Sequence, residues 1–353
     1  MHVDRVNVGA PRPDAGAAPL ACFLCGGTDF SLLVIGYDRM RASADDHRYM
    51  RCTACGLVRL TPLPAPERIA ALYPDEYHAR IAPIRKNFDT AVNRLAIRYC
   101  YGVDSVSRSR LPRYAFRMLS GRILNGFREP YGANRLLDVG CGSGAILETY
   151  RRLGWSVCGI EIDPGATATC RERGLDVHRG TLFDAPLPGR QFDLILFSHV
   201  IEHVLQPAAE LRRAAEFLAP GGRIIVTTPN IQGIGFRLYG SCWYPLEAPR
   251  HLFLFDPYTI RRLGAQAGLT VHRAITQSVP WTLCKSRHYV RTQGQRLPQD
   301  LTRRRAIIEQ SVKREKSFKT YRALMAPFTR LTAACGQGDI MEVEFTAGGA
   351  RCP

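Results

Sequence analysis

The chain has 353 residues and a formal net charge of +17. Its hydrophobic fraction of 46% and charged fraction of 22% are ordinary for a globular protein and exclude a mainly disordered chain. No apolar run approaches the roughly 18 residues of a membrane-spanning helix, and the N-terminus lacks the apolar block of a secretion signal. We therefore expect a cytoplasmic protein of two or three domains, with a disordered tail over residues 1–20.

The positive charge is concentrated in two stretches of the sequence. Residues 85–128 carry 10 basic and 2 acidic side chains, and residues 285–330 carry 13 basic and 3 acidic ones, so the rest of the chain is close to neutral. A local basic excess favours an anionic partner, such as nucleic acid, a phosphorylated carrier or an acidic membrane surface. The plainer alternative is a solvated helix face.

Four of the twelve cysteines form two Cys-x-x-Cys pairs, Cys22 with Cys25 and Cys52 with Cys55. A glycine follows each pair, which suits a tight left-handed turn, and the residues between the pairs read as strands. Four thiolates complete the tetrahedral coordination of zinc and leave no open position for catalysis. We expect a structural zinc ribbon over residues 21–62; a redox pair or a chance match are the alternatives.

A basic segment follows the ribbon. Closely spaced prolines mark a stiff exit from the ribbon, and residues 63–130 read as a helical linker. Its candidate buried positions are Ile69, Leu72, Leu95, Ile97, Phe116, Leu119 and Ile123.

From about residue 131, short apolar runs alternate with helical patterns, which is typical of βαβ units around a parallel sheet. A strand over 136–139 leads directly into the glycine-rich residues 140–144 and a helix. Alternate glycines let the backbone turn sharply and approach a ligand closely. The next strand ends at Glu161, about 20 positions after the loop, where a carboxylate accepts hydrogen bonds from a ribose diol.

The loop and its surroundings resemble a known family. Asp138-Val-Gly140-Cys-Gly142-Ser-Gly144 is similar to D-x-G-x-G-x-G, the first motif of the class I S-adenosylmethionine-dependent methyltransferases. Further segments follow in that family's order: 179–184 as the adenine-flanking loop, 191–197 as the fourth strand and 218–226 as the turn into the fifth. The resemblance covers about residues 134–280 and 336–346; a nicotinamide-binding Rossmann domain is the alternative.

The resemblance implies a Rossmann-like, doubly wound α/β core over residues 131–280 that binds S-adenosyl-L-methionine. The cofactor contacts that it implies are Asp138, Gly140, Cys141, Gly142, Gly144, Glu161, Ile162, Thr181, Leu182 and Ser198. Residues 243–256 also resemble a bacterial subgroup with an N-terminal zinc ribbon, whose members methylate polysaccharides, sugars or secondary metabolites. The expected acceptor is a hydroxyl or carbon of a small molecule, sugar, glycan or secondary metabolite, free or carrier-linked and in some cases anionic.

Candidate bases follow the fourth strand. His199 and His203 are four apart, so on a helix they share a face, with Glu202 beside them. Histidine accepts protons near neutral pH, which makes His199, His203 and His251 the candidate catalytic residues. A structural role for His203, and an anion-binding role for Arg250 with His251, are alternatives. Related quinone O-methyltransferases carry E-x-x-E-H here and can bind a divalent metal, but His199 replaces the first Glu, which argues against such a metal.

Several absent motifs narrow the substrate. The chain lacks the N-P-P-Y or D-P-P-Y turn of nucleobase amino-methylation, the paired-glutamate loop of arginine methyltransferases and the Pro-Cys of cytosine-C5 enzymes. These absences argue against base modification and disfavour nucleic acid as a partner. An RNA methyltransferase that grips phosphates with its ribbon and basic helices remains one alternative, and a non-catalytic binding module with a vestigial cofactor fold is another.

Residues 281–335 form a basic insertion before the last strand. Apolar residues recur there at spacings of three or four among Arg and Lys, which predicts an amphipathic helix kinked near Pro327. It could pack as a cap, form a homodimer face, lie on an anionic membrane at the inner face, or bind nucleic acid. Residues 336–353 supply the last core strand, 340–345, and a tail.

Overall fold

The computed structural model of the protein describes residues 21–40, 45–73, 133–187, 189, 191–314 and 319–348. The tail predicted over 1–20 lies outside these residues, as does the predicted linker from residue 74 onward. The described start of that linker forms two short 3-10 helices, η1 (Pro66–Arg68) and η2 (Ala70–Leu72). Its predicted core positions Ile69 and Leu72 are partly buried against the main hydrophobic core.

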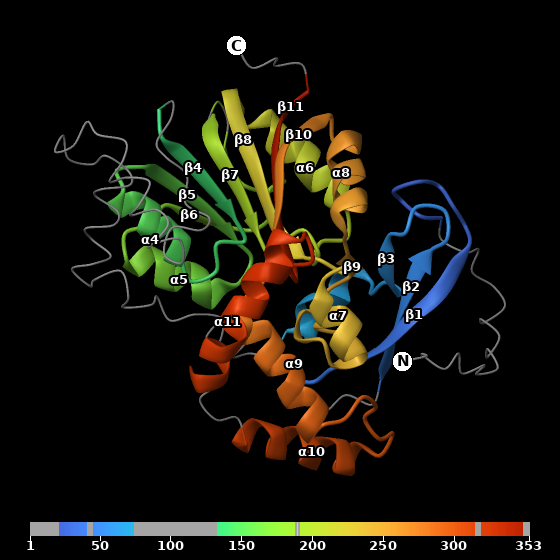
Figure 1. Ribbon diagram of the computed structural model, residues 1–353. Coiled ribbons are helices and arrows are strands. Elements are labelled where there is room, and N and C mark those ends of the chain that lie inside the picture. Colours follow the sequence, from blue (N-terminus) through green and yellow to red (C-terminus); the bar gives the residue numbers. More distant parts are fainter. Residues whose placement is uncertain are drawn as a thin grey trace.

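A seven-stranded sheet, in the order β10-β11-β8-β7-β4-β5-β6, forms the centre of the molecule (Figure 1). Its strands are β4 (Arg135–Val139), β5 (Ser156–Glu161), β6 (Val177–Arg179), β7 (Phe192–Ser198), β8 (Leu218–Pro229), β10 (Leu269–Gln277) and β11 (Ile340–Ala347). Strands β4 to β8 are parallel, and β11 runs antiparallel between β8 and β10.

The chain leaves β4 in one direction to build β5 and β6, then returns to build β7 and β8 on the other side. The connecting helices are α4 (Ala145–Arg152), α5 (Pro164–Glu172), α6 (Pro207–Glu216) and α8 (Pro257–Gln266). Because such crossovers are right-handed, reversing the direction places helices on both faces of the sheet. The predicted doubly wound α/β class is confirmed, and the reversal between β4 and β7 is where ligands bind in such sheets.

The central strands β4 and β7 are buried and largely apolar on both faces, as expected for strands between two helix layers. Leu136 and Leu194 belong to one core cluster with the residues of α4 and α5. Their sequence neighbours Leu137 and Ile195 belong to the larger cluster on the opposite face. Successive side chains along each of these strands therefore pack into two separate cores, one on each face of the sheet.

The N-terminal part forms a second, antiparallel sheet in the order β1-β2-β3-β9 (Figure 1, blue). Its strands are β1 (Phe30–Tyr37), β2 (Asp46–Cys52), β3 (Val58–Thr61) and β9 (Phe253–Leu254). The first three strands correspond to the expected ribbon, whereas β9 comes from the core, almost two hundred residues later. Val58 pairs with Leu254 and Arg59 with Phe253, so backbone pairing joins the ribbon to the core.

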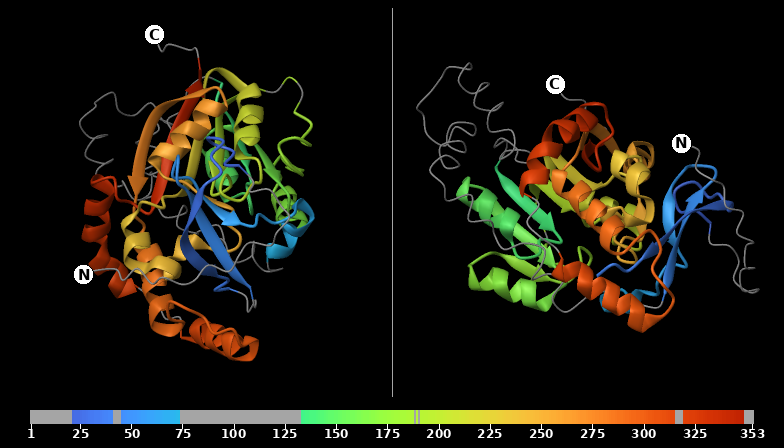
Figure 2. Two further views of the ribbon diagram at one scale, coloured as in Figure 1. Left: turned by 90° about the vertical axis from the view of Figure 1, so that its right-hand side faces the viewer. Right: turned by 60° about the horizontal axis from the view of Figure 1, so that its bottom comes forward.

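The insertion before the last strand is helical, as expected, but it contains three helices where the sequence analysis predicted one kinked helix. These are α9 (Pro280–Thr292), α10 (Leu301–Lys313) and α11 (Lys319–Ala334), and the loop after β8 adds α7 (Ile234–Tyr239), η4 (Gly240–Cys242) and η5 (Tyr244–Leu246). Pro327 lies inside α11. In both views of Figure 2, α10 (dark orange) lies near the ribbon strands, where buried Arg304 pairs with Asp46 and Ile308 packs with Tyr37.

Among the described residues, no helix is both long enough and apolar enough to cross a bilayer.

Candidate functional site

The glycine loop lies at the carboxyl end of β4. Gly140, Gly142 and Gly144 have φ angles of +69°, +52° and +76°, in the left-handed region that favours glycine. A Cβ on Gly140 would lie 2.6 Å from Val200 Cγ2, so this loop contacts the turn that follows β7. Apart from its two chain neighbours, no atom of the described residues lies within 4 Å of a Cβ built on Gly142, which leaves that part of the loop open to a ligand.

Asp138, at the end of β4, is 1% exposed, and neither of its carboxylate oxygens has a hydrogen-bond partner among the described residues. Burial, followed by the nearby charge of Glu161, raises its pKa to about 8. A buried carboxylate with two unsatisfied acceptors is favourable only when a cation or donor meets it. The position therefore fits the cationic part of a ligand.

Glu161, at the end of β5, holds the loop in place. Its Oε2 accepts a hydrogen bond from the backbone N–H of Gly142 at 2.7 Å, and its Oε1 accepts one from Asp163 at 2.9 Å. Each carboxylate oxygen can accept a further bond, so a ribose diol can also donate to Glu161. Together with Asp138, these groups fit S-adenosylmethionine, which carries a sulfonium, an ammonium and a ribose diol.

The predicted adenine-side residues differ in exposure. Ile162, directly after β5, is 55% exposed and offers apolar surface, whereas Leu182 is buried in the main core. The Thr181 hydroxyl donates to Asp184 at 2.6 Å. Phe183, which the sequence analysis did not name, is 52% exposed in the loop that follows the neighbouring strand β6. The sequence signal for Phe183 is an aromatic residue within the segment 179–184, which the resemblance assigns to the adenine-flanking loop.

His199 follows β7 directly, in a turn rather than the expected helix. Its φ of 57° is left-handed, which is uncommon for a residue with a side chain and is a feature of functional sites. The Nδ1 atom of His199 lies 3.2 Å from Glu202 Oε1, and because a carboxylate only accepts, Nδ1 donates. The His199 side chain keeps 43% of its surface accessible, next to the partly exposed Ser198.

Glu202 is completely buried and its two oxygens have different partners. Oε1 accepts from His199, and Oε2 accepts from the Thr228 hydroxyl at 2.9 Å. Burial opposes ionisation, but the His199 hydrogen bond and the neighbouring histidines lower the pKa of Glu202 to about 2. Burial likewise lowers the pKa of His199, but the bond to Glu202 and its charge outweigh burial and raise that pKa above its usual value.

The other two predicted catalytic histidines face the interior. His251 is 2% exposed, its Nδ1 donates to the carbonyl of Pro245 at 2.8 Å, and burial and then His203 lower its pKa to about 4. His203 Nδ1 donates to the Arg250 carbonyl at 3.0 Å, and the Tyr73 hydroxyl lies 3.0 Å from the same nitrogen. The sequence analysis gave Tyr73 no role, because its contact with His203 spans 130 residues.

Arg250 is almost fully buried and already engaged by carboxylates. Its guanidinium donates two hydrogen bonds to Asp38 of the ribbon, both at 3.1 Å, and one to Glu247 at 3.2 Å. The anion-binding alternative for Arg250 would require these carboxylates to be displaced.

Glu202, His203 and His251 each offer a ligand atom within 4.8 Å of the others, a set that could hold a metal ion. Both oxygens of Glu202 already accept hydrogen bonds, from His199 and Thr228. A metal on either oxygen would compete with one of these bonds.

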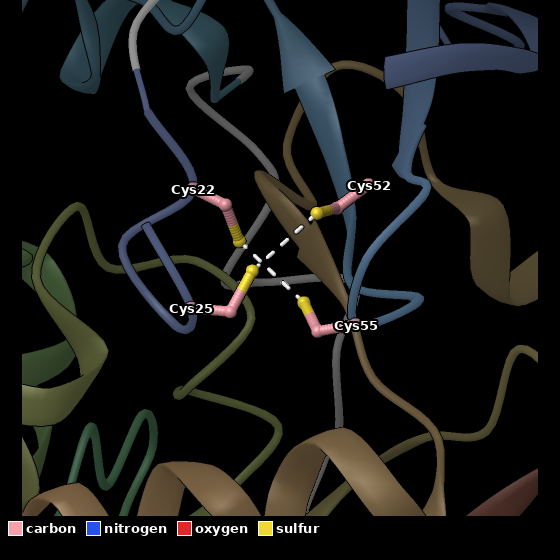
Figure 3. A group of neighbouring side chains, drawn as sticks. All are labelled: Cys22, Cys25, Cys52 and Cys55. Atoms are coloured by element: carbon pink, nitrogen blue, oxygen red, sulfur yellow. Dashed lines mark hydrogen bonds between the residues drawn. The ribbon is translucent and has the colours of Figure 1, made fainter. Parts of the chain in front are cut away.

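The four ribbon cysteines converge on one point (Figure 3). The sulfurs of Cys22 and Cys55 lie 3.6 Å apart, as do those of Cys25 and Cys52. A disulfide requires about 2.05 Å, whereas sulfurs at about 2.3 Å from a tetrahedral zinc lie nearly 3.8 Å apart.

Arg59 lies beside the cysteine cluster, with its guanidinium 4.0 Å from the centre of the Phe30 ring. Burial lowers the pKa of Arg59, and the nearby sulfurs of Cys22 and Cys52 oppose that effect.

A doubly wound sheet, the D-x-G-x-G-x-G loop and an acid at the end of the next strand define the class I S-adenosylmethionine-dependent methyltransferases. The sequence analysis predicted an enzyme of that class, and the comparisons support this prediction over part of the chain. Residues 104–274 match the family model described as a methyltransferase domain.

Curated relatives share part of this region. Ubiquinone biosynthesis O-methyltransferase of Azorhizobium caulinodans is 32% identical over 148 residues, which cover 39% of this chain and 58% of that protein. The same-named enzyme of Cereibacter sphaeroides strain ATCC 17029 is 38% identical over 129 residues, covering 34% of this chain and 52% of its own. The chain thus spans between half and three fifths of these two relatives' lengths.

One solved structure that the chain is similar to is a SAM dependent methyltransferase from Archaeoglobus fulgidus. It is 16% identical, with a TM-score of 0.40, and the match covers 66% of this chain and 93% of that chain.

Proposed function

We propose that the protein transfers the methyl group of S-adenosylmethionine to a hydroxyl group of a small molecule, with His199 as the general base. The observation that carries the proposal is the His199–Glu202 pair, which lies after β7 beside the glycine loop. The relatives' names describe O-methylation, which favours a hydroxyl over a carbon acceptor. Sugars, glycans and secondary metabolites, free or carrier-linked, remain within the proposed acceptor class.

The hydrogen bond to Glu202 sets the tautomer of His199. Because Nδ1–H donates to Glu202, the lone pair of the neutral ring lies on Nε2, the nitrogen available to an acceptor. Glu202 stabilises the imidazolium that forms when Nε2 takes the hydroxyl proton. Thr228 holds the carboxylate in place from the other side, so the ring keeps one orientation.

The other residues of the site bind the cofactor and align the acceptor with its methyl group. Asp138 and Glu161 lie at the ends of neighbouring strands, so both carboxylates face the same edge of the sheet. S-adenosylmethionine supplies the methyl group and the sulfide leaving group. Positioning an acceptor oxygen in line with that methyl accounts for a large part of the rate enhancement in reactions of this kind.

We also propose that Cys22, Cys25, Cys52 and Cys55 hold one structural zinc ion. The proposal is supported by four sulfurs within 4.8 Å of one another and by the 3.6 Å separations, which fit a tetrahedral ion. A metal with four protein ligands has no open position for substrate, so its role is to hold the ribbon together.

The function is tested by measuring transfer of labelled methyl groups to a panel of hydroxylated phenols, sugars and polyols. We expect His199→Ala to lower turnover by about 10²- to 10⁴-fold, while S-adenosylhomocysteine binding stays unchanged. His272→Ala is the matched control, since its side chain is also 43% exposed and near a buried glutamate, but on β10. Equal turnover in the His199 variant and the wild type would remove His199 from the reaction.

A further inference from the structure

One face of helix α11 exposes large apolar side chains. Leu324, Phe328 and Leu331 are 71%, 38% and 64% exposed, and their spacing of four and three residues places them on one side of the helix. The opposite side contains the buried Ala326 and Thr329. The helix therefore has an inner side that packs against the protein and an apolar outer side that nothing covers among the described residues.

This face ends at the edge of the sheet that carries the candidate active site. Near the end of α11, the Ala333 carbonyl accepts a hydrogen bond from the Thr276 hydroxyl at 3.0 Å, at the end of β10. Strand β11 then begins with Ile340 opposite Pro229, at the carboxyl end of the parallel strand β8. Figure 1 shows α11 beside α9 at this end of the sheet.

The helical insertion that carries the apolar face is strongly basic. Between residues 280 and 334, the described exposed basic residues are Arg287, Arg291, Arg296, Arg303, Arg305, Lys313, Arg314 and Arg330. The described exposed acidic residues in the same range are Asp300 and Glu309. Arg287 of α9 lies 4.6 Å from the ring of Tyr321, one turn before Leu324, so positive charge adjoins the apolar face directly.

We propose that α11 docks on an anionic lipid bilayer, with Leu324, Phe328 and Leu331 inserted at the interface and the surrounding arginines on the lipid headgroups. An apolar helix face flanked by basic residues is the pattern of a helix that lies in the plane of a membrane surface. Apolar contact and attraction to anionic lipid act together in such binding. The docking does not depend on the proposed reaction.

The charge and composition of this face also argue against a second copy of the chain, or nucleic acid, as its partner. A symmetric contact between two copies would bring two basic surfaces together, and like charges at an interface disfavour association. Nucleic acid would satisfy the arginines through its phosphates, but exposed leucines add nothing to phosphate binding. An anionic bilayer satisfies both the charge and the apolar side chains.

The test is co-sedimentation of the full, cofactor-binding chain with vesicles of phosphatidylcholine alone or containing about one quarter phosphatidylglycerol. We expect binding to the anionic vesicles and at least tenfold weaker binding to the neutral ones. The double variant Leu324→Ser with Leu331→Ser, and the variant Arg287→Glu with Arg291→Glu, should each lose at least tenfold in vesicle affinity. Leu32→Ser, which alters a 53% exposed leucine of the ribbon, is the matched control and should bind like the wild type.

S-adenosylhomocysteine binding by every variant shows that the core is folded. Absence of binding to anionic vesicles, or binding that the α11 variants leave unchanged, overturns the proposal. A dimer in sedimentation velocity that only the Leu324 and Leu331 changes dissociate would assign the face to a second copy instead. RNA binding that outcompetes vesicles and requires Arg287 and Arg291, but neither leucine, would also overturn it.

Discussion

Glu202 connects the candidate base to the interior of the molecule. It is fully buried, receives hydrogen bonds from His199 and Thr228, and lies 4.0 Å from His251 Nε2. Its pKa of about 2 is below the ordinary value, so its ionisation stabilises the fold above the unfolded pKa. That contribution is lost as the pH falls toward 2.

The same carboxylate sets the pH dependence of the proposed reaction. Glu202 raises the pKa of His199, and the base is active only when deprotonated, so the rate should rise with pH through a midpoint above about 6.5. Glu202→Gln removes the negative charge, which should move this midpoint to lower pH and reduce kcat. The check is the pH profile of kcat/KM; an unshifted midpoint would show that His199 titrates independently of Glu202 or is not the base.

Two glycines of the loop, Gly140 and Gly142, differ in the space that surrounds them. Gly142→Ala meets open space but adopts a left-handed φ, so we expect about 1–2 kcal/mol of destabilisation and weaker S-adenosylhomocysteine binding. Gly140→Ala adds a clash with Val200 and should lower Tm further. Calorimetric titration measures the loss of S-adenosylhomocysteine affinity, and thermal unfolding measures the loss of stability. Unchanged ligand affinity in Gly142→Ala would show that the ligand does not approach this part of the loop.

Sequence could identify the loop residues because their chemistry is local. The backbone of the loop requires left-handed φ angles, which explains the glycines at 140, 142 and 144. Glu161 can be identified by its position at the end of the next strand. The partners of the histidines are distant, since Thr228 lies 26 residues from Glu202 and Tyr73 lies 130 from His203. The sequence alone does not reveal such pairs, because the two residues meet only in the folded chain.

At the level of elements, the ribbon braces the loop that carries His251. The Tyr49 hydroxyl donates to the His251 carbonyl at 2.8 Å, and the Leu252 N–H donates to the Glu202 carbonyl at 2.8 Å. The buried ion pair of Arg250 with Asp38, the residue directly after β1, ties the same loop to the ribbon. The ribbon is thus connected through one loop to the backbone of the candidate base's partner.

Removing one member of that buried pair tests the connection. Asp38→Ala leaves the Arg250 guanidinium without its bidentate partner, and loss of such a partner destabilises by about 3–5 kcal/mol. Asp29→Ala, at an exposed position of the ribbon, should change stability by less than about 0.5 kcal/mol. Urea unfolding measures both. A change below about 1 kcal/mol for Asp38→Ala would mean that the ion pair does not hold the loop.

Periodicity predicted the strands of the core well, because buried parallel strands are short apolar runs between turns. It failed at 199–203, where spacing of four suggested a helix, yet α6 begins only at Pro207 and the preceding residues form a turn. It also missed β9, which has two residues and is a strand only because β3 pairs with it.

At the level of the whole molecule, the proposed zinc holds together a part that has little core of its own. We expect one zinc per chain, lost in Cys55→Ser together with a lower Tm, whereas Cys335→Ser, at an exposed cysteine, keeps the metal. Mass spectrometric metal analysis measures the zinc content of each variant, and thermal unfolding measures its Tm. A stable, metal-free Cys55 variant would contradict it, and a second equivalent lost in His251→Ala would place a metal at Glu202, His203 and His251 instead.

The most direct test of the account is calorimetric titration of the zinc-loaded protein with S-adenosylhomocysteine, beside Glu161→Ala and the exposed control Glu172→Ala. We predict one site per chain with a Kd in the micromolar range. Loss of charged hydrogen bonds at Glu161 should weaken binding by about 10- to 100-fold, and Glu172→Ala should have no effect. A well-folded protein that does not bind the ligand, or binds it equally without Glu161, would contradict the assignment of this edge as the cofactor site.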